Sequence, residues 1–148
     1  MIKRWLVGAA LLAACGGPST RVQTTAPSPN PEYALHEFMA AVADSNLPKM
    51  AEFWGTSKGS AAETGDPPDY PKRIEVMQIY LRGFSFRVVA SVPVDATQSA
   101  QSMGVVMTRA DCVKSVAVTA VRTRSGRWVI QEIDLTAVGS PAAPCTQG

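Results

Sequence analysis

The sequence predicts an α+β domain in which N-terminal helices pack on a curved, four-stranded antiparallel meander. Two observations lead to this fold class. Up to Gly83 the apolar residues recur at helical spacing, whereas after Gly83 they alternate with polar residues as in strands. Short segments rich in Gly, Pro, Asn and Asp separate these stretches and mark helix ends and turns. The sheet has one apolar face, and the preceding helices are the available cover for it.

Helices are expected at residues 31–44, 48–54 and 71–82. Asn30 is a typical N-cap for the first of them, and it is followed by a proline at the first helical position. The apolar stripe of this helix has the spacing i, i+3, i+4, i+7 and consists of Leu35, Phe38, Met39 and Val42. Between the second and third helices, residues 56–70 are rich in Gly, Ser, Pro and Asp, and we expect a loop there.

Strands are expected at residues 84–92, 103–109, 112–123 and 127–138. Residues 124–126 should form a tight hairpin turn, with Gly126 in a left-handed conformation. The apolar residues of the last strand change faces midway, which predicts a β-bulge near Gln131 and Glu132.

The N-terminus has the features of a secretory signal peptide. Lys3 and Arg4 precede an apolar run at residues 5–14, which is too short to cross about 30 Å of hydrocarbon as a helix. The run ends in Leu-Ala-Ala immediately before Cys15. This pattern resembles the lipobox of bacterial lipoproteins, which implies removal of residues 1–14 and lipidation of Cys15.

The lipoprotein resemblance also implies a location and a domain organisation. The mature chain would be lipid-anchored in the bacterial cell envelope, with the periplasmic face of the outer membrane favoured because Gly, and not Asp, follows the cysteine. Residues 15–31 would be the lipidated cysteine and a flexible tether, since this Pro/Ser/Thr-rich segment has little apolar surface to bury. The folded domain would cover residues 32–139, and residues 140–148 would form a C-terminal tail.

Helices followed by a meander of long strands resemble the NTF2-like, cystatin-like superfamily, in which a curved sheet wraps around a helix to form a cone. The segments that carry this resemblance are the helix end at 38–44, the Phe53-Trp54 pair and residues 126–130. The superfamily has a strand between the second and third helices, where this sequence indicates a loop. The alternative fold is an open sheet flanked by helices, without a cone.

Large apolar side chains from helices and strands are the candidates for a pocket in such a cone: Phe38, Trp54, Tyr80, Phe86 and Trp128. Core packing also explains them, because a domain of about 110 residues needs such side chains to fold. An isomerase-like site would require a carboxylate inside the cone, and Asp134 on the last strand is one candidate. His36, the only histidine, lies off the apolar stripe of its helix and should face solvent.

Charge and composition exclude several classes of function. The chain has 14 basic and 12 acidic residues, and removal of Lys3 and Arg4 leaves 12 of each. This balance argues against binding to nucleic acid. The chain contains 3 cysteines and 1 histidine without a CxxC pair, so we expect no metal site and no cofactor. Three arginines flank the last turn, where they would be solvated or would contact an acidic partner: Arg122, Arg124 and Arg127.

Cys112 and Cys145 are the cysteines that remain once Cys15 is lipidated. An exported domain occupies an oxidising compartment, where thiols usually pair. The tail after residue 138 is long enough to return Cys145 to the hairpin end that carries Cys112, so we expect an intramolecular disulfide. Free thiols, or a bond to a partner, are the alternatives.

The function that these patterns favour is non-catalytic: a lipid-anchored envelope domain that binds a small apolar ligand or an envelope protein. The alternatives are a structural accessory subunit of an envelope complex and a cone-pocket isomerase or lyase. A large pocket with a buried carboxylate would favour the enzyme, whereas a filled core with an exposed apolar patch would favour an interaction protein.

Overall fold

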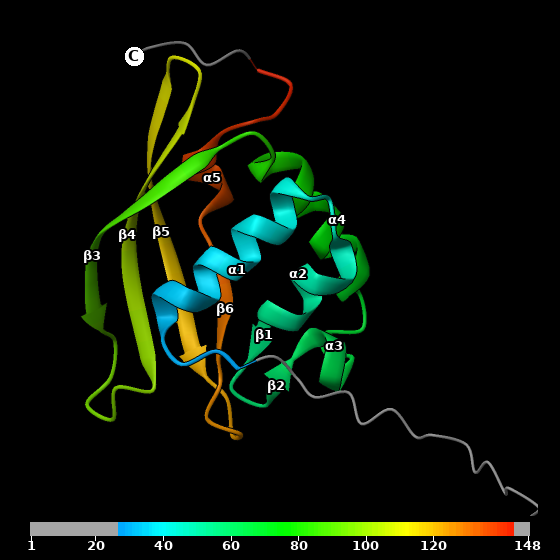
Figure 1. Cartoon of the computed structure of the whole chain (residues 1–148), viewed down its shortest axis with the longest axis vertical. Helices are drawn as coiled ribbons and strands as arrows, with labels where there is room; N and C mark the ends of the chain where they lie inside the picture. Colours follow the sequence, from blue (N-terminus) through cyan, green and yellow to red (C-terminus); the bar gives the residue numbers. More distant parts are fainter. Residues whose placement is uncertain (1–26, 144–148) are drawn as a thin grey trace, which may run out of the picture.

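The structure, a computed structural model, describes residues 27–143. The chain is α+β, as the sequence predicts, with a four-stranded antiparallel sheet in the order β3-β4-β5-β6 and helices on one side of it (Figure 1). The elements in chain order are α1 (Pro31–Ala43), α2 (Leu47–Phe53), β1 (Gly55–Thr56), β2 (Gly59–Ser60), α3 (Ala61–Thr64), α4 (Tyr70–Leu81), β3 (Ser85–Pro93), β4 (Ala100–Arg109), β5 (Cys112–Arg122), β6 (Trp128–Ile133) and α5 (Leu135–Val138).

The three main helices form where the sequence predicts them, and side chains cap the first turns of α1 and α2. The Asn30 side chain accepts a hydrogen bond from the backbone N–H of Tyr33 at 2.8 Å and so caps α1. Asn46 caps α2 in the same way, with the N–H of Lys49 at 3.1 Å. Pro71 lies in the first turn of α4, where its missing N–H costs nothing.

The prediction that residues 56–70 form a loop is wrong, because the segment contains the end of β1, all of β2 and helix α3. Strands β1 and β2 pair antiparallel, with Gly55 opposite Ser60. A side chain at Gly55 would not fit, because a Cβ there would lie 2.3 Å from the carbonyl oxygen of Gly59. Ser60 then starts α3 through a capping box: its hydroxyl accepts from the N–H of Glu63, and the Glu63 carboxylate accepts from the N–H of Ser60.

Two β-bulges shape the main sheet. Thr119 lies opposite Glu132 and Ala120 opposite Ile130, so Gln131 is the extra residue in β6. This confirms the bulge predicted there. A second register shift falls between Val88 and Ala90 in β3, where the sequence predicts regular alternation.

The last strand is shorter than expected. It ends at Ile133, and the expected continuation to Val138 is wrong because residues 135–138 form α5. The physical reason is Asp134, whose carboxylate accepts hydrogen bonds from the backbone N–H groups of Thr136 at 3.1 Å and Ala137 at 3.2 Å. These N-cap bonds turn the chain into a helix.

The core lies between the helices and the face of the sheet formed by β4, β5 and β6, with Met103, Val105 and Met107 of β4 among its most buried side chains. Helix α1 packs on β6 and β5, and β3 is the strand at the end of the sheet opposite β6 (Figure 1). The largest fully buried side chains include Phe38, Phe53, Leu35, Met50, Ile74 and Ile130. A bridge between Trp54 and Ile130 brings β1 beside β6. The edge of the sheet at β6 therefore lies beside β1, whose second residue, Thr56, begins the segment expected as a loop.

Ordered contacts begin before α1. Ser28, which the sequence assigns to the tether, is buried, and its carbonyl accepts a hydrogen bond from the N–H of Trp128 at 3.0 Å. Within residues 27–143, no helix is both long enough and apolar enough to span a bilayer.

Candidate functional site

An open groove of about 790 Å³ lies between α1 and the first half of β3. Helix α1 contributes one wall and β3 the other. The residues that line it are Asn30, Glu32, Tyr33, His36, Met39, Ala40, Ala43, Phe84, Ser85, Phe86, Arg87 and Val88.

The groove exists because α1 covers the sheet only in part. Tyr33, His36 and Ala40 follow one another at helical spacing, so they form the face of α1 that borders the groove. The opposite face of α1 packs on β5 and β6. On β3, Phe86 and Val88 share one face, are half-buried and pack against the edge of the core.

The groove has an apolar floor and a rim of ionisable groups. Met39 is 4% exposed and Phe84 is 9% exposed, and they form the deep part. At the rim, the His36 side chain is 72% exposed, with its Nδ1 atom 3.8 Å from the carboxylate of Glu37. The His36 ring meets the ring of Phe86 edge-on, with 6.1 Å between their centres. This combination suits a ligand with one apolar and one polar side.

The five predicted pocket residues do not line one cavity. Phe38 and Trp128 are buried in the core, as the alternative interpretation of these side chains expects. Trp54 borders a separate hollow of about 510 Å³ between α4 and β6, and Tyr80 borders one of about 230 Å³ beside α5. Only Phe86 of the five lies in the α1–β3 groove.

Sequence reasoning missed the other groove residues. Met39 belongs to the predicted apolar stripe of α1, so the sequence assigns it to the core. Tyr33 and His36 lie off that stripe and look like plain surface residues. The missing information is which part of the sheet α1 covers, and helical periodicity does not contain it.

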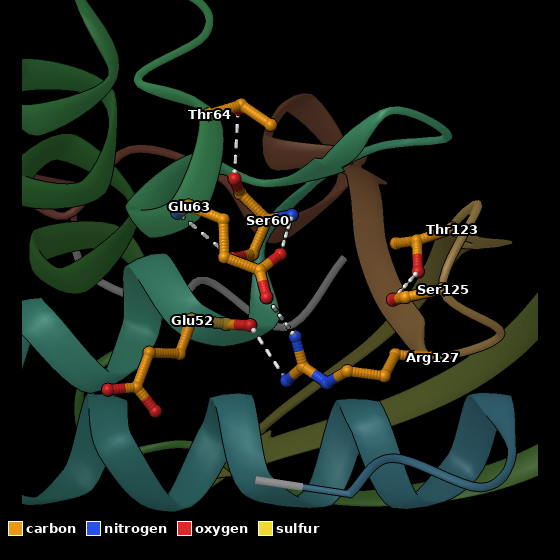
Figure 2. A network of polar contacts seen from close by, with 7 residues as sticks. All are labelled: Glu52, Ser60, Glu63, Thr64, Thr123, Ser125 and Arg127. Atoms are coloured by element: carbon orange, nitrogen blue, oxygen red, sulfur yellow. Dashed lines mark hydrogen bonds and ion pairs between the residues drawn. The ribbon is translucent and has the colours of Figure 1, made fainter. Parts of the chain in front are cut away.

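The cluster of three arginines suggested that Arg127 is a solvated turn residue, but the structure shows that it is not. Its side chain is 11% exposed and points inward, toward α2 and α3 (Figure 2). One guanidinium nitrogen donates to the backbone carbonyl of Glu52 at 3.3 Å, and another lies 3.5 Å from the carboxylate of Glu63. The guanidinium also lies 5.6 Å from the centre of the Phe53 ring. Arg127 therefore ties the start of β6 to α2 and α3.

The carboxylate considered for an isomerase-like site has a structural role. Hydrogen bonds from the Thr136 hydroxyl and from the backbone N–H of Ala137 lower the pKa of Asp134, which caps α5. Among residues 27–143, the buried polar side chains are hydroxyls: Ser28, Ser60 and Thr123. In the same range, no three His, Cys, Asp or Glu side chains gather in a metal-binding arrangement.

Of the cysteines singled out by the sequence, the described residues include Cys112. It is 3% exposed and begins β5. The chain after α5, residues 139–143, lies at the same end of the molecule as the β4–β5 turn (Figure 1). Cys15 and Cys145 lie outside the described residues, so the lipidation site and the disulfide stay predictions.

No protein-family model matches this chain, and no curated protein matches it.

Proposed function

We propose that this chain is a lipid-anchored protein of the bacterial cell envelope whose α1–β3 groove binds a small apolar ligand or an envelope partner without catalysing a reaction. The groove is the observation that supports this proposal. It joins an apolar floor at Met39 and Phe84 to an ionisable rim, while the core between the helices and strands β4, β5 and β6 consists of buried apolar side chains. A filled core with an accessible apolar surface is the arrangement expected of an interaction protein.

We also propose that the domain is an NTF2-like cone. The short strand β1 between α2 and α3 supports this, because the superfamily has a strand at that place in the chain order. The bridge from Trp54 to Ile130 sets β1 beside β6, at the edge of the sheet opposite β3. Helices α1 and α2 then lie on the face that such a cone encloses.

The membrane anchor rests on the lipobox-like sequence that ends at Cys15. We expect Cys15→Ser to leave an unlipidated chain that no longer partitions into detergent, and intact-mass measurement would show the missing lipid. If the variant and the parent chain have the same partitioning and differ in mass only by the substitution, the chain is not a lipoprotein.

A structural accessory subunit is the second candidate function. Exposed valines in and directly after β3 favour this function. The exposed fraction is 53% for Val89, 58% for Val92 and 61% for Val94. Large apolar side chains this exposed are typical of surfaces that contact other proteins. No observation within residues 27–143 favours the isomerase or lyase.

The test of the proposed function is native mass spectrometry after extraction from membranes in mild detergent. The variant Ala40→Trp puts a large side chain into the groove, and Ala62→Trp puts one into a hollow of about 400 Å³ between α2 and α4 as a matched control. We expect a co-purifying ligand or protein with the parent chain and with Ala62→Trp, but not with Ala40→Trp. Equal loss or equal retention in both variants would contradict binding in the groove.

A further inference from the structure

Within residues 27–143, one edge of strand β3 has no neighbouring strand. The strand pairs with β4 on one side, and it is the last strand in the order of the sheet. Within residues 27–143, the backbone of Ser85–Pro93 makes no hydrogen bond beyond those to β4. In an antiparallel edge strand, alternate residues direct both N–H and C=O away from the sheet. These unpaired groups match the backbone of another extended chain.

The α1–β3 groove runs along this free edge. Its lining includes residues from both faces of β3, namely Phe86 and Val88 on one face and Ser85 and Arg87 on the other. A surface that touches successive residues of a strand follows the edge of the strand. A chain laid there would have β3 on one side and α1 on the other, and α1 spans about 20 Å at 1.5 Å per residue.

The two walls determine which side chains such a chain would carry. Residues on the groove side of an added strand would meet Phe86, Val88 and Met39, so they would be apolar. Residues on the other side would lie across from Arg87. Arg87 is exposed, and within residues 27–143 its guanidinium forms no ion pair. An acidic residue is the favourable cross-strand neighbour for it.

We propose that the partner bound in the groove is an extended peptide segment with alternating apolar and acidic residues, which adds to β3 as a further strand. This inference rests on the proposed function and names the chemistry of the partner. The bulge between Val88 and Ala90 limits the regular edge to residues 85–88. The segment therefore needs only four to six residues, and a longer peptide gains nothing along this edge.

The probe is a capped hexapeptide of alternating valine and aspartate, titrated into the full chain in mild detergent and followed by fluorescence anisotropy and backbone amide NMR. We expect saturable binding, with amide shifts concentrated at residues 84–88 and on α1. Lysine in place of aspartate should weaken binding by about two- to fivefold, the size of a cross-strand charge pair. In Arg87→Glu this preference should reverse, whereas Arg124→Glu, on the distant hairpin turn, should behave like the parent chain.

Backbone N-methylation distinguishes strand addition from simple surface binding. One peptide carries N-methyl groups on its valines and the other on its aspartates. In an added strand only one of these two sets points its N–H groups at β3, so we expect one peptide to lose at least about tenfold in affinity and the other to bind nearly normally. Equal binding of both peptides would overturn strand addition.

Other occupants of the edge give different results. If a second copy of the chain covers β3, sedimentation will show a dimer whose β3 amides are already protected, and this result would refute the peptide. If residues 16–26 cover it, β3 amides will be protected in the monomer and the peptide will not bind. If Ala40→Trp releases a native ligand but the hexapeptide never binds, the groove function stands and the strand proposal falls.

Discussion

The guanidinium of Arg127 lies 3.5 Å from the carboxylate of Glu63, although the two residues are 64 positions apart in the chain. Arg127 immediately precedes β6, whereas Glu63 belongs to the capping box of α3. The same arginine donates to the backbone carbonyl of Glu52 at the end of α2. One side chain therefore joins two helices to the sheet, at the end where the hairpin turn of residues 124–126 lies.

Replacing Arg127 should destabilise the fold. In Arg127→Met the contact of the guanidinium with the Phe53 ring is lost, and the carbonyl of Glu52 and the carboxylate of Glu63 each lose a donor. We expect the free energy of unfolding to fall by about 1–3 kcal/mol. Urea denaturation measures the change. Arg124→Met, at an exposed position on the same turn, is the control and should stay within about 0.5 kcal/mol of the parent chain. Equal effects would show that Arg127 is not a structural link.

Asp134 should make stability depend on pH in the acid range. Its pKa is lowered in the folded chain by the Thr136 hydroxyl and by the backbone N–H groups of α5. A group of this kind stabilises the fold above its unfolded pKa of about 3.9, and the stabilisation is lost as pH falls through the folded pKa. In Asp134→Asn this contribution is absent at every pH.

The urea midpoint of Asp134→Asn should therefore lie below that of the parent chain at pH 7, and the gap should narrow as pH is lowered below about 4. Paired denaturation curves from pH 2 to pH 7 provide the measurement. A gap that is constant over this range would mean that the ionised carboxylate does not cap α5.

A disulfide between Cys112 and Cys145 should be found by peptide mapping without reductant. The bond would close a loop of about 34 residues, and its reduction should lower the free energy of unfolding by about 3–4 kcal/mol. The variant Cys15→Ser leaves Cys112 and Cys145 as the two cysteines of the chain, so mapping it also excludes a bond to any Cys15 that escaped lipidation. Alkylation of Cys145 in protein that was never reduced would contradict the pairing.

Local chemistry explains which parts of the fold were predictable. Asn30 and the proline after it fix the start of α1, and the change of face within β6 reveals the bulge at Gln131. Strands β1 and β2 contain two residues each, too few for an alternation to be recognised. Helix α3, which follows them, has a signal in the spacing of Ser60 and Glu63, which is that of a capping box.

The candidate site was less predictable because it depends on contacts far apart in the chain. Periodicity identifies the apolar face of α1 but not the strands that it covers, so the opening beside Phe86 could not be foreseen. Arg127 turns inward because the Glu52 carbonyl, 75 positions earlier in the chain, lies within reach of it. The sequence of the turn shows a cluster of arginines but does not indicate which of them turns inward.

Site-specific photocrosslinking in cells tests the central claim, that the α1–β3 groove binds a partner or ligand, most directly. A benzophenone amino acid replaces Tyr33 at the rim of the groove, or Val113, which is 65% exposed and does not line it, as the control. We expect a defined adduct from position 33 that disappears when Ala40→Trp is added, and no such adduct from position 113. The same adduct from both positions, or none from position 33, would contradict the account.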